Sequence, residues 1–155
     1  MQFEDLIEKR HSIRSYTQQK IPCEVLNKII SQAKLAPSSR NKKPCDFILV
    51  TDSGDLEKLS LAKNAGSQMI KDAAAAIVVT GDSEKSDVWI EDCSIAMTYL
   101  HLAAVDAGLG SVWVQLRNRK TASGQDSGMY VKQLFHIEKK MEVLAVLSLG
   151  YENSL

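Results

Sequence analysis

Residues 88–116 read VWIEDCSIAMTYLHLAAVDAGLGSVWVQL, and they predict the longest helix of the chain followed by a strand. The helix is expected over residues 88–107, because Gly108 stands where a glycine commonly follows the last turn. Most of its residues are apolar, and its polar side chains fall on one narrow stripe: Glu91, Ser94, Thr98 and His101. A helix that is apolar on most sides is buried on more than one side. In a chain this small, we therefore expect a partner subunit to cover part of this helix.

Helices and strands alternate on both sides of this stretch. Short apolar runs predict strands over 46–51, 74–80, 110–116 and 142–149, of which 74–80 is typical of a fully buried strand. Helical spacing predicts helices over 2–9, from Pro22 up to Pro37, near 53–71, and from the end of a polar loop at Gly128 to about Ile137. This alternation predicts an α/β or α+β sandwich.

The composition is that of one globular domain. The 155 residues are 45% apolar and 25% charged, and no linker separates two parts, so we expect a single domain over 1–155. Nineteen basic and nineteen acidic side chains leave no net charge to attract nucleic acid or an anionic membrane. No uncharged stretch reaches the roughly 20 apolar residues that cross a bilayer. We therefore expect neither nucleic acid nor a membrane as a partner.

The cysteines and histidines give no metal or disulfide pattern. Cys23, Cys45 and Cys93 are odd in number and form no CxxC pair, which argues against a disulfide framework and a zinc site. We interpret all three as packing residues in a reducing cytoplasm. His101 and His136 lack the spacing of metal ligands, so no metal is expected. The opening MQFEDLIEKR is acidic and not typical of a signal peptide, which agrees with a cytoplasmic location.

Three segments carry residues suited to a polar ligand. RHSIRSY, residues 10–16, places two guanidiniums four residues apart with a hydroxyl between them, and arginine pairs well with phosphate. APSSRNKKP, residues 36–44, follows an amphipathic helix and precedes a strand. AGLGSVWVQ, residues 107–115, leaves a helix and enters a strand, which is the reverse of a dinucleotide-binding fingerprint. Taken singly, these are a solvated helix end, an ordinary turn and a helix stop.

Together, in this order and spacing, the segments resemble the nitroreductase-like FMN family. That family has an Arg-(Arg/His)-Ser-x-(Arg/Lys)-x-(Tyr/Phe) opening and an Ala-Pro-Ser-x-x-Asn-x-x-Pro loop. Its D-x-x-x-A-x-x-x-L-x-L-A-A-x-x-x-G-L-G-S-x-W pattern is similar to Asp92–Trp113, and its sheet ends like LSLGY at 147–151. The resemblance implies an α+β, nitroreductase-like three-layer fold, with a mixed, mostly antiparallel central sheet flanked by helices.

The resemblance also implies FMN in a groove between the two subunits of a homodimer. Residues of one subunit are then expected to hold the phosphate, ribityl chain and pyrimidine edge: Arg10, His11, Ser12 and Arg14. The other subunit is expected to contribute Pro37, Ser38, Ser39 and Asn41. A third group is expected to pass the flavin ring with backbone groups near N5: Val114, Gln115 and Leu116. The interface is expected to include the 88–107 helix, and a charge placed at Met97 or Leu100 is expected to split the dimer or to unfold the protein.

Some positions depart from the family pattern. Many relatives carry a basic residue after the last strand, but no Lys or Arg follows Lys140 here. Cys45 replaces a usual aromatic residue, and Lys43 replaces a common glutamine. The short 81–88 connection leaves no room for the helical lid of larger relatives. These departures predict weaker FMN binding and an open acceptor pocket.

The function implied by the resemblance is hydride transfer from NAD(P)H, through flavin N5, to a small electron-poor acceptor such as a nitroaromatic or a quinone, in a ping-pong cycle. Arg14 would stabilise the negative charge of the reduced flavin. No protein acid or base is required, so no catalytic side chain is expected. Two alternatives remain: a flavin-binding redox sensor or FMN store without turnover, and a cofactor-free interaction module in which residues 10–14 are surface charge.

Overall fold

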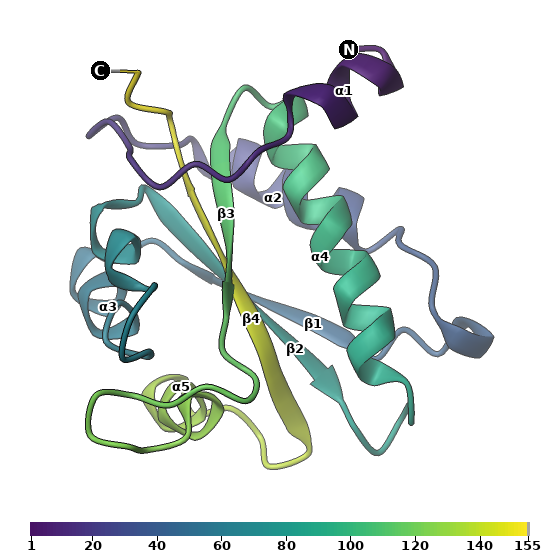
Figure 1. Cartoon of the computed structure of the whole chain (residues 1–155). Coiled ribbons are helices and arrows are strands. Elements are labelled where there is room, and N and C mark those ends of the chain that lie inside the picture. Colours follow the sequence, from purple (N-terminus) through teal and green to yellow (C-terminus); the bar gives the residue numbers. More distant parts are fainter. Residues whose placement is uncertain (155) are drawn as a thin grey trace.

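The computed structural model describes residues 1–154 and places an antiparallel sheet between two layers of helices (Figure 1). The helices are α1 (Phe3–Lys9), α2 (Cys23–Ala33), α3 (Ser53–Leu59), α4 (Trp89–Asp106) and α5 (Ser127–Phe135), with 3-10 turns η1 (Ser39–Asn41) and η2 (Gln68–Asp72). The strands are β1 (Cys45–Val50), β2 (Ala75–Asp82), β3 (Gly110–Gln115) and β4 (Met141–Gly150), in the order β1-β2-β4-β3. The predicted α+β class is confirmed. All three strand pairs are antiparallel, and the parallel component is one isolated bridge between Ser12 and Ser111.

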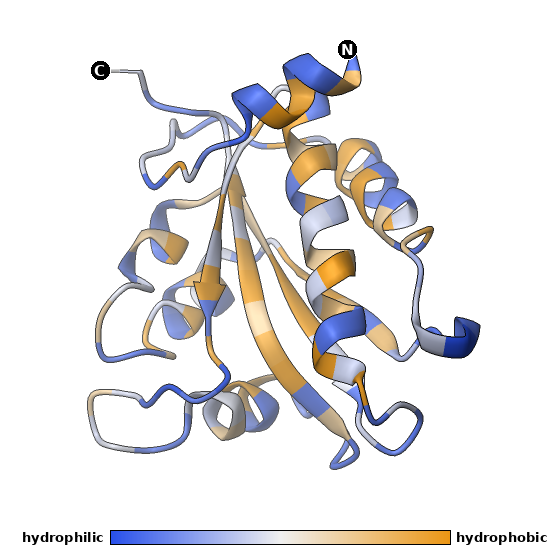
Figure 2. Ribbon diagram, turned by 45° about the vertical axis from the view of Figure 1, so that its right-hand side comes forward, coloured by the Kyte–Doolittle hydropathy of each residue, from blue (hydrophilic) through white to orange (hydrophobic). Residues whose placement is uncertain are grey.

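The two faces of the sheet carry separate hydrophobic clusters. Alternate residues of β2 point to opposite faces, so Ile77 contacts the cluster under α2 and α4, while Val78 contacts the cluster under α3, η2 and α5. Figure 2 shows the apolar residues running along the strands and the facing sides of these helices. Residues Ala75–Gly81 of β2 are buried, which confirms the fully buried strand that the apolar run predicts.

The long helix α4 ends where the sequence predicts, and the face that carries Met97 and Leu100 packs against the sheet of the same subunit. Gly108 has a φ of 77°, the left-handed conformation that suits glycine after a helix. Met97 and Leu100 are 0% exposed and pack against the sheet of their own subunit, so of the two expected effects of a charge there, unfolding is the one that this packing favours. Ile95 and Tyr99 are the exposed apolar residues of α4, at 40% and 39%.

The single helix predicted near 53–71 is wrong in its length. The α-helix α3 ends at Leu59, and the chain then turns before the 3-10 turn η2. The Ser67 hydroxyl is buried and donates to the carbonyl of Ser60 at 2.7 Å. The amide of Asn64 donates to the carbonyl of Lys120 at 2.8 Å. Gly66 has a φ of 93°, which an α-helix does not contain. The Asn64 amide, which would continue the helix, is therefore bonded to another loop, and the Ser67 hydroxyl holds the turn that replaces the helix.

The N-terminal segment lies against the sheet because two paired glycines leave room for it. Gly110 of β3 is paired with Gly150 of β4. A Cβ on Gly110 would lie 2.7 Å from Ile13, and one on Gly150 would lie 2.6 Å from the Tyr16 ring. The Tyr16 hydroxyl is hydrogen-bonded to the Ile13 carbonyl and to the Ser148 hydroxyl, and burial raises the pKa of Tyr16 to about 12. The packing of Ile13 and Tyr16 on the two glycines therefore sets the position of residues 10–14 beside the sheet.

Within residues 1–154, no helix combines the length and the apolar character needed to cross a membrane.

Candidate functional site

The N-terminal segment presents its polar side chains beside the open edge of β3. The amide of Ile13 donates to the carbonyl of Ser111 at 2.9 Å, and Ile13 itself is buried. His11, Ser12 and Arg14 are exposed, and Arg10 is half-buried. With Glu152 and Asn153 from the C-terminal segment, residues 11–15 line an open pocket of about 380 Å³. Arg14 lines this pocket and Arg10 does not, although both arginines belong to the segment that Ile13 anchors.

Strand β3 lies at the edge of the sheet, so the peptide N–H and C=O groups on its outer side form no hydrogen bonds with another strand within residues 1–154. Because the Ser111 carbonyl points away from β4, alternation places the peptide groups of Trp113 and Gln115 on the same open edge. The predicted site residues Val114 and Leu116 have buried side chains in the core, and the Leu116 amide donates to the Leu144 carbonyl. Of the three predicted residues on this strand, Gln115 therefore offers free peptide groups to a ligand.

Behind this segment, a buried histidine supports β3. The Nδ1 atom of His101 lies 2.7 Å from the Ser111 hydroxyl. Burial, with the positive charge of Arg10, lowers the pKa of His101 to about 4. The imidazole is therefore neutral at pH 7 and can pair with the Ser111 hydroxyl. This agrees with the structural role that a lone histidine predicts.

The second predicted segment is a strained loop clamped by one carboxylate. Arg40, Asn41 and Lys43 have φ values of 52°, 54° and 51°, a left-handed conformation that only glycine adopts without strain. The buried Asp92 accepts a hydrogen bond from the Ser39 amide at 2.8 Å and another from the Ser86 hydroxyl at 2.9 Å. Asp92 thus fixes the loop, whose Pro37 and Ser38 line a pocket of about 410 Å³.

The two segments lie at opposite ends of α4 in one chain (Figure 1). Ser39 is bonded to Asp92 in the first turn of α4, whereas Arg10 acts on His101 near the other end. These two α4 residues are nine positions apart, which is roughly 14 Å along a helix. A single chain therefore does not bring Arg10–Arg14 and Pro37–Asn41 together.

The sequence does not predict the contacts of the Asp92 carboxylate or the contact between Cys45 and Cys93. Asp92 is one position of the family pattern, and an acidic residue in the first turn of an apolar helix is the signal that would indicate a buried hydrogen-bond acceptor. The sequence predicts Cys45 and Cys93 as separate packing residues, yet their sulfur atoms lie 2.7 Å apart. They are 48 positions apart in sequence, so no local pattern joins them.

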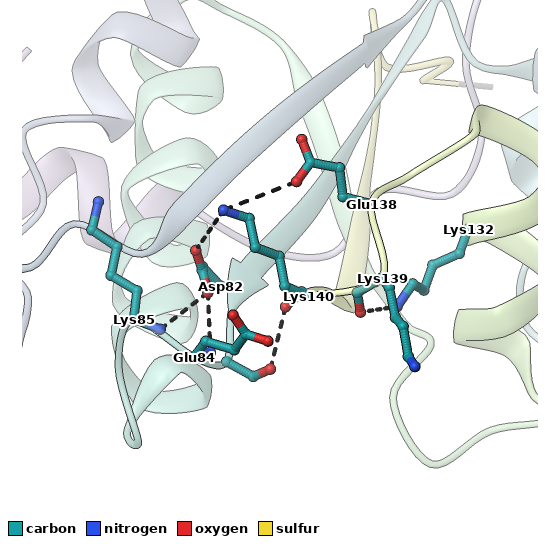
Figure 3. Close-up of polar contacts among 8 residues, drawn as sticks. Asp82, Glu84, Lys85, Lys132, Glu138, Lys139 and Lys140 are labelled. Atoms are coloured by element: carbon teal, nitrogen blue, oxygen red, sulfur yellow. Dashed lines mark hydrogen bonds and ion pairs between the residues drawn. The ribbon is translucent and has the colours of Figure 1, made fainter.

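The opposite end of the sheet carries a charged cluster with a structural role (Figure 3). Lys140 lies 3.5 Å from Asp82, which joins the ends of β2 and β4. Partial burial works against ionisation of Asp82, but hydrogen bonds from the Lys85 and Glu84 amides and the charge of Lys140 lower its pKa overall. The side chain of Lys132 donates to the Lys139 carbonyl at 2.8 Å. Among residues 1–154, no group of His, Cys, Asp and Glu is placed to hold a metal ion.

Comparison with known proteins identifies the family. The family model described as the Nitroreductase family matches residues 7–65 and 54–151. A protein of Archaeoglobus fulgidus, provisionally named an NADH dehydrogenase/NAD(P)H nitroreductase, is 39% identical over 150 residues, which cover 94% of this chain and 83% of that protein. Because the family model and this relative both match most of the chain, this chain belongs to the nitroreductase family.

Solved structures agree with this assignment. An FMN-dependent nitroreductase from Clostridium difficile R20291 superposes with a TM-score of 0.93 at 39% identity, covering 97% of this chain and 87% of that one. A structure from Parabacteroides distasonis, provisionally named an NADH dehydrogenase/NAD(P)H nitroreductase, has a TM-score of 0.90 at 33% identity, covering 98% and 88%. The three-layer fold expected from the sequence is therefore confirmed.

Proposed function

We propose that the protein is an FMN-dependent oxidoreductase that uses NAD(P)H to reduce a small electron-poor acceptor, with the flavin held between two identical subunits. The observation that carries this proposal is the separation of the two anchored polar segments to opposite ends of α4. Two copies related by a twofold axis would bring Arg10–Arg14 of one against Pro37–Asn41 of the other. The name of the Clostridium difficile relative, an FMN-dependent nitroreductase, supports the choice of cofactor.

The surface of the subunit supports pairing of two copies. Helix α1 buries none of its residues in its own subunit, and Phe3 is 67% exposed. Phe3, Leu6, Tyr99 and Leu102 line an open, mainly apolar depression between α1 and α4 of about 610 Å³. Apolar surface of this kind on a soluble chain commonly marks an interface. A second copy covering this face would bury the side of α4 that its own subunit leaves open.

The donor set fits a flavin mononucleotide. Arg10, Ser12 and Arg14 supply two guanidiniums and a hydroxyl for a phosphate, and the open edge of β3 supplies free peptide groups for a flat ring with polar edges. When bound, FMN would accept a hydride from the nicotinamide and pass it to the acceptor. In this arrangement Arg14 would place a fixed positive charge where negative charge develops.

The compact fold favours one shared binding place for donor and acceptor. Six residues, 83–88, separate β2 from α4, so this connection carries no lid over the site. Donor and acceptor would then enter in turn, which is a ping-pong cycle.

Anaerobic mixing of FMN-loaded protein with NADH or NADPH tests the proposal. We expect loss of the oxidised flavin absorbance, recovery on adding a quinone or nitroaromatic, and parallel double-reciprocal lines in the steady state. Intersecting lines would contradict sequential use of one groove. Failure of bound flavin to bleach with either nucleotide would contradict the reductase.

A flavin-binding sensor or store without turnover is the second candidate. One observation favours it: the short 83–88 connection between β2 and α4 provides no lid that would enclose a second substrate over the flavin. Tight FMN binding without bleaching is the result expected of a store.

A further inference from the structure

Two thiols from distant parts of the chain meet at the wall of the pocket that Pro37 and Ser38 line. Cys45 is the first residue of β1, and Cys93 lies in the first turns of α4. Their sulfur atoms are 2.7 Å apart, and both thiols are free. No other cysteine of the chain is this close, because Cys23 is exposed at the start of α2.

A glycine keeps the space that this contact needs. Gly81 of β2 is the residue paired with Cys45. A Cβ on Gly81 would lie 2.7 Å from the Cys93 sulfur and 2.6 Å from the Trp89 ring. Any larger residue at this position would displace the Cys93 sulfur or the Trp89 ring. The contact between the two sulfurs therefore depends on three parts of the fold, namely β1, β2 and α4.

The two thiols differ in access. Cys45 is half-buried and lines the pocket of about 410 Å³, so a small solute reaches it. Cys93 is 0% exposed and lies behind Cys45, with its thiol directed at the Thr80 carbonyl at 3.5 Å. The hydrogen bond with Cys45, burial and the nearby Asp92 carboxylate all raise the pKa of the Cys93 thiol. Cys93 therefore stays a thiol at neutral pH, shielded from solvent.

We propose that Cys45 and Cys93 form an oxidation site at which a hydroperoxide closes a reversible disulfide within the subunit. The peroxide oxygen is transferred to the Cys45 sulfur, giving a sulfenic acid and one water from hydrogen peroxide. The Cys93 sulfur then attacks the Cys45 sulfur, loses its proton, and expels the second water as the disulfide forms. The two thiols together lose two electrons, and the peroxide gains them. A dithiol reductant restores both thiols by exchange.

Closing this bridge fastens the start of β1 to α4 one residue beyond Asp92. Asp92 holds the 37–41 loop through Ser39, so the bridge adds a covalent tie beside the clamp of that loop. The tie also closes a long loop of the unfolded chain, which raises stability. The site stands apart from the proposed reductase activity, because its chemistry needs neither FMN nor NAD(P)H.

Peroxide treatment of the full-length protein tests the site. After quenching, unfolding and alkylation, intact mass should show one alkyl group on each oxidised chain, at Cys23, and three after dithiothreitol. Tryptic digestion should link the peptide 43–58 to the peptide 86–117, and reduction should release both. Thermal melting should be higher for the oxidised form than for the reduced form.

Two variants separate this pair from other chemistry. Cys23→Ser should keep the linked peptides, and Cys45→Ser should lose them and the rise in melting temperature. In the wild type, unlinked peptides with Cys45 oxidised further and Cys93 still alkylated would overturn the proposal. Linkage only between chains, through Cys23, would overturn it as well. None of these measurements depends on flavin. If the protein proves not to be a reductase, they still test the proposed disulfide.

Discussion

At the scale of single residues, Arg14 is expected to carry much of the affinity for FMN. It is exposed on a segment that the Ile13–Ser111 hydrogen bond anchors. Replacing Arg14 by Ala should weaken FMN binding by about 1.5–3 kcal/mol, or roughly 10- to 150-fold in Kd, because a charge-assisted hydrogen bond is lost. Titration of flavin fluorescence measures the change. Arg119→Ala, an exposed arginine on another loop, is the matched control, and equal Kd values for the two variants would remove Arg14 from the site.

Asp92 is expected to act on flavin binding through the loop that it clamps. Asp92→Ala leaves the Ser39 amide and the Ser86 hydroxyl without their partner, which should cost about 1–3 kcal/mol of unfolding free energy and also weaken FMN binding. Asp92→Asn keeps an acceptor for the Ser39 amide and should restore part of both. Urea unfolding and flavin titration give the two values. Glu91→Ala, at the exposed neighbouring position, should change neither; if it matches Asp92→Ala, the clamp is not the cause.

His101 should make the protein less stable in mild acid. Its pKa is about 4 in the folded protein and about 6.5 when unfolded, so the unfolded chain binds more protons between these values. Stability is therefore full above pH 6.5 and is lost as the pH falls towards 4. Between pH 7 and pH 5 we expect a loss of about 2 kcal/mol from this residue. Urea unfolding at both pH values checks this, with His101→Gln expected to lose the pH dependence; an unchanged dependence would contradict the assignment.

At the scale of elements, the two faces of α4 should respond differently to the same charge. Ile95→Glu places a carboxylate on the exposed face and should give folded monomers, because the proposed interface would bury an unpaired charge. Met97→Glu points into the core and should unfold the subunit. Light scattering and circular dichroism separate the two outcomes. Met129→Glu, on the exposed surface of α5, should remain dimeric, and a dimeric Ile95→Glu protein would place the interface elsewhere.

The elements with strong apolar periodicity were predictable from the sequence. Residues Trp89–Asp106 and the four strands lie where their patterns place them, since burial of a periodic face decides both pattern and structure. The 53–71 region was misread because Leu56, Leu59 and Ala62 keep a helical spacing while Ser67 bonds back to Ser60. Local pattern cannot reveal such a bond, and it equally cannot reveal the contact between Cys45 and Cys93.

The candidate site was predictable in its segments but not in its details. The Arg10–Arg14 and Pro37–Asn41 segments stood out by residue type. Their separation along α4 follows from the contact of Ser39 with Asp92, which are 53 positions apart, and from the position of Arg10 near His101. The burial of the Val114 side chain also follows from packing between distant segments, which residue spacing does not encode.

At the scale of the whole molecule, the proposed sharing of the site between two subunits predicts how mixed dimers should behave. Arg14→Ala and Asn41→Ala should each damage every site of their own homodimer, because each site uses both segments. A heterodimer of the two variants would contain one intact site and one doubly altered site. Random mixing after joint refolding should therefore restore high-affinity FMN binding to roughly a quarter of the sites. Flavin titration of the mixture measures this, and no recovery would mean that each site lies within one chain.

The glycine pair at positions 110 and 150 sets an order of assembly. The contact of Tyr16 with Ser148 spans 132 positions, so we expect the segment bearing Arg10 and Arg14 to pack in place only after β3 and β4 have paired. Contacts of such long range form late in folding, because their loop-closure entropy is recovered only when most of the chain is in place. Residues 10–14 are thus expected to be among the last to be fixed, and a flavin bound there, as proposed, would require a sheet that is already complete.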